Sequence, residues 1–271
     1  MRLKLAYTVA TPDTVTSPML AYRGDLDAVL GDLADLGYDG VELMLRDPAA
    51  LDAGQIEGLV RAHGLRVAAF GTGQVAEEDG LSLLAADESA RAAAVERLRA
   101  VLRFAGRFGA PVVIGRFRGS VPKGISREQG LDWLTSGLTA AAETAREAGV
   151  PIVVEPQNRF NTNLIFTVME GVALVERVGS EWVTVLGDTF HMNIEEVSMS
   201  APFLQAGRHL RHVHFGDSNR LAPGRGHLNF PEIVAALDAA GYDGFVSLEI
   251  VQQGDSHRAA RQSIAYLRAL E

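Results

Sequence analysis

The chain has 271 residues, of which 47% are hydrophobic and 22% charged, a composition typical of a globular protein and unlike that of a disordered one. The formal net charge is -9 and no Lys/Arg cluster interrupts it, which argues against nucleic acid and anionic membranes as partners. There are no cysteines, so disulfides and thiolate-bound metals are excluded, and any metal must be bound by oxygen and nitrogen atoms.

The N-terminal segment, residues 1–7, has basic residues within its apolar run and is not followed by the apolar core of a signal peptide. No apolar stretch approaches the roughly 20 residues that a membrane span requires. We therefore expect a cytoplasmic protein without membrane contact.

Short β-branched runs alternate with helical patterns along the chain, as in βα units around a parallel sheet. The expected strands are 3–9, 40–44, 66–70, 111–114, 151–155, 183–188, 210–215 and 245–250. Glycines mark the crossings from helix to strand, because a left-handed backbone ends many helices. They are Gly37, Gly64, Gly109, Gly149, Gly179, Gly207 and Gly241. The pattern predicts an α/β fold in which residues 1–271 form one domain, a single (β/α)8 TIM barrel.

A doubly wound open sheet is the alternative fold. However, the first βα turn lacks a glycine-rich phosphate loop. The candidate site residues also follow four consecutive late strands, which a closed barrel brings together more easily.

Ionisable side chains stand at or near the ends of these four strands. They are Glu155, Asp188, His214 and Glu249. The carboxyl ends of parallel strands share one mouth of a barrel, so these side chains would meet. Each alone is compatible with an ordinary strand-end residue, but three buried carboxylates together require a cation or strong pKa shifts. A carboxylate-rich set with one imidazole suits Mn2+, Mg2+ or Co2+.

Two further residues follow members of this set. His191 lies three positions after Asp188, and Arg220 comes shortly after His214. We expect both to bind substrate oxygens, with Arg220 near a developing oxyanion. In the alternative interpretation, His191 caps a loop and Arg220 pairs with Asp217.

Arginines also follow the fourth expected strand, at Arg116 and Arg118. Either could hold a phosphate or carboxylate group of a substrate, although solvated arginines are the commoner case.

The second half of the chain carries motifs of a known family. They are EPQNRF at 155–160, DTFHMN at 188–193, His212 and His214 with Arg220, and Glu249. In these motifs the chain resembles the ketose 3-epimerases of the xylose-isomerase-like barrel superfamily, typified by D-tagatose and D-psicose 3-epimerase. The resemblance covers the whole barrel.

The resemblance implies one bound divalent ion, Mn2+ in the first place with Co2+ or Mg2+ as alternatives. Its ligands would be Glu155, Asp188, His214 and Glu249. Glu155 and Glu249 would also be catalytic, one removing a proton from the substrate carbon and the other returning a proton to the opposite face. His191 and Arg220 would bind the carbonyl oxygen. Relatives of this kind are often dimers or tetramers, so a homo-oligomer is compatible with the resemblance.

One position departs from the family pattern. Where epimerases of free ketoses usually carry a glutamate near O1 of the sugar, this chain has Asn161. We therefore expect Asn161 and Arg116 to contact a substrate that is a keto sugar, a sugar phosphate or another modified sugar.

Rival functions share parts of the same site. An aldose-ketose isomerase of the hydroxypyruvate isomerase type and an inosose dehydratase-like lyase use the same metal frame, and the sequence does not separate them from an epimerase. Endonuclease IV has further metal-binding histidines after the third and fourth strands, where this chain reads Phe70-Gly71 and Ile114-Gly115, and the acidic net charge disfavours DNA. A non-catalytic sugar-binding barrel is disfavoured because both candidate bases are present.

Overall fold

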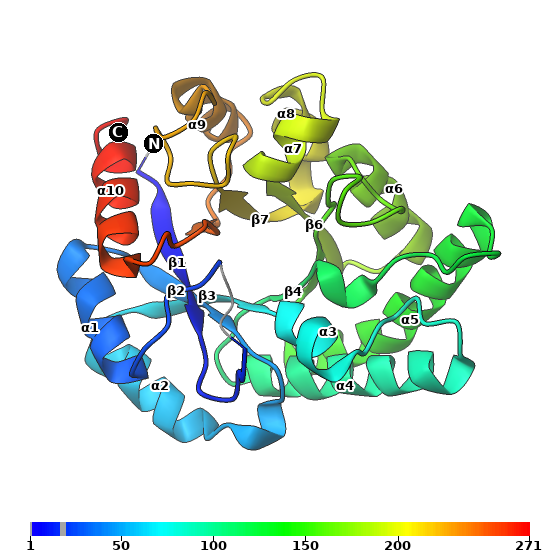
Figure 1. Cartoon of the computed structure of the whole chain (residues 1–271). Helices are drawn as coiled ribbons and strands as arrows, with labels where there is room; N and C mark the ends of the chain where they lie inside the picture. Colours follow the sequence, from blue (N-terminus) through cyan, green and yellow to red (C-terminus); the bar gives the residue numbers. More distant parts are fainter. Residues whose placement is uncertain (1, 17–19) are drawn as a thin grey trace.

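A closed ring of parallel strands forms the centre of the protein (Figure 1). The computed structural model describes residues 2–16 and 20–271, and eight strands lie within them. They are β1 (Lys4–Ala10), β2 (Gly40–Met44), β3 (Arg66–Gly71), β4 (Val112–Ile114), β5 (Ile152–Val154), β6 (Val183–Asp188), β7 (Leu210–Phe215) and β8 (Phe245–Leu248). Each strand pairs in parallel with the next, and β8 pairs with β1 to close the ring. The predicted TIM barrel is confirmed.

Helices surround the strands on the outside (Figure 1). They are α1 (Leu26–Leu36), α2 (Ala53–Ala62), α3 (Gly73–Asp79), α4 (Glu88–Gly106), α5 (Arg127–Ala148), α6 (Val168–Val178), α7 (Thr189–Glu195), α8 (Ala201–Ala206), α9 (Phe230–Ala239) and α10 (Ser256–Arg268). Short 3-10 turns occur at η1 (Pro48–Ala50), η2 (Arg116–Arg118) and η3 (Gly207–His209). All seven glycines expected at the crossings have a positive φ.

The side chains inside the barrel divide into an apolar and a polar half. The apolar half comes from β3 to β6 and consists of Ala69, Val113, Val153 and Leu186. The polar half comes from β7, β8, β1 and β2 and contains His212, His214, Ser247, Thr8 and Glu42, all buried. The main hydrophobic core lies between the strands and the surrounding helices. Because buried polar groups need partners, we expect the side chains of the polar half to be hydrogen-bonded to one another.

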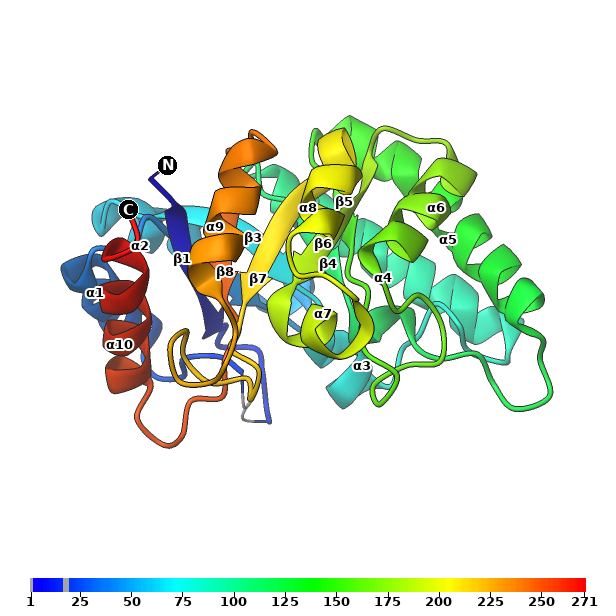
Figure 2. The same cartoon turned by 90° about the horizontal axis from the view of Figure 1, so that it is seen from above.

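The two ends of the barrel differ. The short helices α3 and α7 directly follow β3 and β6, and both lie at the carboxyl end of the strands (Figure 2). The start of the described chain lies beside its C-terminus, and the Leu3 amide donates to the Glu271 carboxylate at 2.8 Å. Over the described ranges, no helix combines the length and the apolar character needed to cross a membrane.

Candidate functional site

Four ionisable side chains converge at the carboxyl ends of β5 to β8. Glu155 directly follows β5, Asp188 ends β6, His214 lies in β7, and Glu249 directly follows β8. Each offers one ligand atom, and these atoms all lie within 4.8 Å of one another with all four residues buried. The structure therefore brings together the four residues that the sequence placed at strand ends.

The four side chains surround one point without bonding to each other. His214 Nδ1 is 3.5 Å from Glu155 Oε1, 3.8 Å from Asp188 Oδ2 and 3.7 Å from Glu249 Oε2. The first three of these atoms, His214 Nδ1, Glu155 Oε1 and Asp188 Oδ2, are buried and have no hydrogen-bond partner in the described part of the chain. Since buried polar atoms are rarely left unpaired, this arrangement fits a cation bound between them.

The charges at this point also fit a cation. Burial raises the pKa of Asp188, and the Glu249 and Glu155 carboxylates add to this effect, so that the pKa lies at about 7 although Arg220 and His214 oppose the increase. Repulsion between the three carboxylates therefore disfavours their simultaneous ionisation, and a single arginine does not balance their charge. A divalent ion bound by oxygen and imidazole ligands would supply the missing positive charge.

The position of Asp188 follows from its place at the start of α7. Its Oδ1 atom accepts hydrogen bonds from the backbone N–H groups of Phe190 at 2.7 Å and His191 at 3.3 Å. This is the usual contact of an aspartate at a helix N-cap. The cap fixes the carboxylate and leaves Oδ2 directed at the centre.

Glu155 is held from two sides. Its Oε2 atom accepts a hydrogen bond from Gln157 Nε2 at 2.7 Å. A Cβ atom at Gly115 would lie 1.9 Å from the same oxygen, so only glycine leaves room for the carboxylate there.

Arg118, which the sequence suggested would be solvated, is fully buried and donates to the backbone oxygens of Glu155 and Ile165. That expectation was wrong because the loop after β5 folds over this side chain.

Glu42 on β2 is a site residue that sequence reasoning missed. Its carboxylate lies 3.0 Å from His214 Nε2, on the opposite side of the ring from the other three acids, and 2.9 Å from His212 Nε2. Burial raises the pKa of Glu42, but His214 and His212 outweigh it and hold the pKa below its ordinary value. The signal was a lone acid inside an otherwise apolar strand.

His191 presents a donor to the same centre. Asn158 Oδ1 accepts from the Phe160 amide, so its Nδ2 faces His191 Nδ1 at 2.7 Å and donates to it. The neutral ring then carries its proton on Nε2, which lies 4.0 Å from Glu155 Oε1. Burial, with Arg220 adding to it, lowers the pKa of His191 to about 3, so the ring is uncharged near neutral pH.

Arg220 reaches the centre from the loop after β7. Its guanidinium donates a hydrogen bond to Glu249 and lies 3.6 Å from Asp188 Oδ2 and 4.8 Å from the centroid of the Phe190 ring. The alternative pairing with Asp217 was wrong. The Asp217 carboxylate instead accepts backbone N–H groups of its own loop, from Ser218, Gly224 and Leu228.

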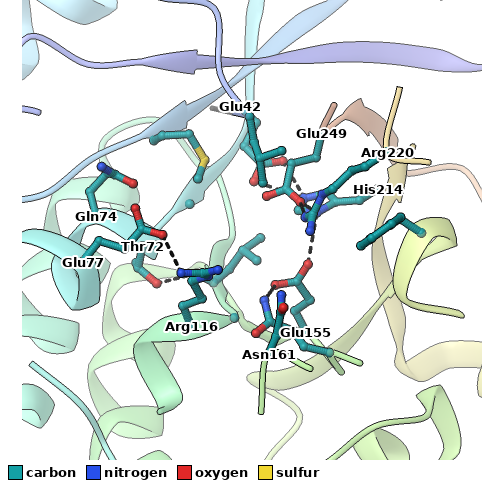
Figure 3. Close-up of a pocket in the computed structure, with 18 of the residues that line it drawn as sticks. Glu42, Thr72, Gln74, Glu77, Arg116, Glu155, Asn161, His214, Arg220 and Glu249 are labelled. Carbon is teal, nitrogen blue, oxygen red and sulfur yellow. Dashed lines mark hydrogen bonds and ion pairs between the residues drawn. The ribbon is translucent and has the colours of Figure 1, made fainter. Parts of the chain in front are cut away.

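A cavity of about 710 Å³ opens beside these residues. Asn161 and Arg116, for which the sequence predicts substrate contacts, line it together with Gln74 and Glu77. Arg116 is half-exposed and forms an ion pair with Glu77 at 2.9 Å. In Figure 3 this pair lies across the cavity from Glu155 and Arg220.

Residues 30–270 match the family model of the xylose isomerase-like TIM barrel. The chain belongs to the xylose isomerase-like TIM barrel family. Within this family it is 33% identical over 232 residues to L-ribulose 3-epimerase of Mesorhizobium japonicum, an alignment that covers 84% of the chain and 76% of the relative.

Solved structures agree with this family assignment. An L-ribulose 3-epimerase is 28% identical with a TM-score of 0.83, covering 97% of this chain and 93% of its own. A D-psicose 3-epimerase from Clostridium cellulolyticum, solved with D-tagatose, has the same fold, with a TM-score of 0.82 at 24% identity over 99% of this chain and 98% of its own. Several relatives of this chain are named as ketose 3-epimerases, and the chain is an enzyme of the sugar epimerase group.

Proposed function

We propose that this protein is a divalent-metal-dependent ketose 3-epimerase. The observation that carries the proposal is the set of three buried, unpaired atoms that face each other within the described residues, Glu155 Oε1, Asp188 Oδ2 and His214 Nδ1. Together with Glu249 they offer three carboxylates and one imidazole, a donor set that favours Mn2+, with Co2+ or Mg2+ as alternatives. When bound, the ion withdraws charge from the carbonyl oxygen of the sugar and so makes the neighbouring C–H more acidic.

Glu155 and Glu249 are the proposed acid and base. They come from strands on different sides of the centre, and Figure 3 shows them entering the cavity from separate walls. One carboxylate takes the proton from C3 on one face of the sugar. The other gives a proton to the opposite face, so that the configuration is inverted without any net oxidation or reduction.

His191 and Arg220 are the proposed donors to the carbonyl oxygen. His191 directs an Nε2–H group at the centre, because its Nδ1 atom accepts from Asn158. The Arg220 guanidinium lies against Glu249, at the position where it can face both the base and the oxygen. Fixed donors of this kind stabilise the negative charge that develops on the oxygen when the C–H bond breaks.

The substrate that the cavity favours is an uncharged keto sugar. Arg116, the cation on the far wall, forms an ion pair with Glu77, and this pair carries no net charge that would attract a phosphate or carboxylate group. Asn161 adds an uncharged polar side chain to the same wall. Keto sugars such as L-ribulose, D-psicose and D-tagatose, after which the relatives are named or with which they were solved, are the first candidates.

Deuterium uptake tests the proposal. The Mn2+-loaded protein is incubated in D2O with L-ribulose, D-psicose, D-tagatose and their phosphates, and NMR follows exchange at each carbon. We expect exchange and inversion at C3 of a free ketose, and their loss when the metal is removed by a chelator. Exchange at C1 or C2 alone would make the protein an aldose-ketose isomerase and overturn the proposed reaction.

A further inference from the structure

Glu42 is a fully buried carboxylate in the middle of β2, inside the barrel. Its oxygens lie 3.0 and 3.2 Å from His214 Nε2, and one of them lies 2.9 Å from His212 Nε2. His212 Nε2 is also 2.9 Å from Ser247 Oγ. Glu42 takes no part in the proposed proton transfer, because His214 stands between it and the candidate bases.

The contact between Glu42 and His214 determines which ring nitrogen of His214 carries the proton, and therefore which one can act as an acceptor. An ionised carboxylate only accepts hydrogen bonds, so the bonded Nε2 atom of His214 must carry a proton. A neutral imidazole has one protonated nitrogen, and its Nδ1 atom is then left with a free electron pair. Nδ1 is the atom that lies 3.5 Å from Glu155 Oε1 and 3.7 Å from Glu249 Oε2.

The orientation of the His214 ring is fixed by the same group of residues. The rings of His212 and His214 stand edge to face at 86°, with centroids 5.3 Å apart. Since Glu42 contacts both rings and Ser247 contacts only His212, the carboxylate is the group that holds His214 in place. A neighbouring carboxylate also increases the basicity of an imidazole ligand.

Glu42, His212 and His214 could also be viewed as a second metal site, because their ligand atoms lie within 4.8 Å of one another. The hydrogen bonds argue against this. The atoms that face each other in this trio are already hydrogen-bonded at 2.9 to 3.2 Å. The other ring nitrogen of His214, Nδ1, has no hydrogen-bond partner among the described residues and points away from the trio. The trio is therefore better explained as support for the single centre described above.

We propose that Glu42 is a positioning residue of the metal centre. It accepts the Nε2–H group of His214, fixes the plane of the ring and thereby keeps Nδ1 available as a ligand. This inference rests on the proposed metal-dependent function. It concerns a residue of the N-terminal half of the chain, which supplies none of the four candidate ligands.

Glu42→Gln tests the proposal, because glutamine has the same shape but only one accepting oxygen. Its NH2 group would face an imidazole nitrogen, which favours the tautomer with the proton on Nδ1 of His214. We expect Mn2+ to bind about 10- to 100-fold more weakly, measured by calorimetry and by the electron paramagnetic resonance signal of free Mn2+. Turnover of the variant should recover as the Mn2+ concentration is raised, which a damaged base would not allow.

Ser247→Ala is the matched control. It removes the hydroxyl that contacts His212 but leaves both contacts between Glu42 and His214 in place. The control should bind Mn2+ within about 2-fold of the unsubstituted protein, well inside the effect expected for losing a carboxylate next to a ligand. Equal weakening in both variants would overturn the proposal, since it would mean that any change in the barrel interior disturbs the centre.

A measurement on the unsubstituted protein does not depend on whether the variant folds. With 15N-labelled histidine and bound Mg2+, NMR should show His214 protonated on Nε2 and unprotonated on Nδ1. The opposite tautomer would overturn the inference, as would unchanged Mn2+ affinity in Glu42→Gln, and either result leaves the proposed function standing. Failure of the unsubstituted protein to bind any divalent ion would overturn both.

Discussion

The Arg220 guanidinium is bonded to the Glu249 carboxylate, the group at the end of β8 that we propose as a base. Arg220 is a non-glycine residue with a φ of 60°, a conformation that few side chains adopt without support. The backbone N–H of Arg220 donates to the backbone oxygen of Asp217 at 2.7 Å, and the backbone oxygen of Arg220 accepts from the Val251 N–H at 2.8 Å. The loop thus holds the arginine in a strained conformation that directs its charge at the centre.

Replacement of Arg220 by glutamine should lower kcat/KM for the ketose by about 100- to 1,000-fold, the usual loss when one donor to a developing oxyanion is removed. Steady-state kinetics at saturating Mn2+ measures the effect. Arg225→Gln is the matched control, because Arg225 is exposed on the same loop and does not line the cavity. Similar losses in both variants would show that the loop and not the guanidinium matters.

Replacement of Glu249 by glutamine should lower kcat by about 100- to 10,000-fold, the range typical for loss of a general acid or base. The amide oxygen can still approach a cation, so some affinity for Mn2+ and sugar should remain, measurable by calorimetry. Glu232→Gln, at an exposed position of α9, is the control. Unchanged deuterium uptake at C3 in Glu249→Gln would exclude Glu249 as the base.

Replacement of Arg118 by methionine should reduce the free energy of unfolding by about 2 to 3 kcal/mol, because the backbone oxygens of Glu155 and Ile165 lose a charged donor in a buried place. Urea unfolding provides the measurement. The control is Arg127→Met, which removes an exposed ion pair with Glu170 and should cost less than about 1 kcal/mol. Equal costs would contradict a structural role for the buried arginine.

Glu78 should make part of the stability depend on pH. It accepts hydrogen bonds from the Val15 and Thr16 amides, the Thr16 hydroxyl and Gln74. Burial raises its pKa, but these bonds outweigh burial and lower the pKa to about 2. The folded pKa lies below the unfolded value of about 4.3, so the stabilisation is complete above that pH and is lost as the pH falls towards 2.

The stability difference between the unsubstituted protein and Glu78→Gln should therefore be largest near pH 7 and shrink below about pH 4. Urea unfolding at several pH values measures it. A difference that stays constant over this range would show that the carboxylate charge does not contribute.

The fold could be predicted because its signals are local. The glycines at the helix ends need only their own backbone conformation, and Gly37, Gly149 and Gly179 end their helices in the left-handed region. The convergence of Asp188 and His214 followed from the same reasoning, since strand order in a barrel brings the ends of β6 and β7 together.

The missed residues depend on contacts between distant parts of the chain. Glu42 is separated from His214 by 172 residues and meets it only across the closed barrel. Arg118 is of a type that is usually exposed, and nothing near it in the sequence indicates that the loop containing Ile165 covers it. Residue type and spacing therefore indicated the acids around the centre but not the groups that orient them.

The placement of all four candidate ligands in the second half of the chain has a consequence for dissecting the protein. A half-barrel fragment from β5 to the C-terminus would contain each of the four candidate ligands, yet it would lack Glu42 and the β1 strand that pairs with β8. Fragment complementation should therefore restore a working centre only when the first half docks along both open edges. The N-terminal half acts as a template for a centre to which it contributes no ligand.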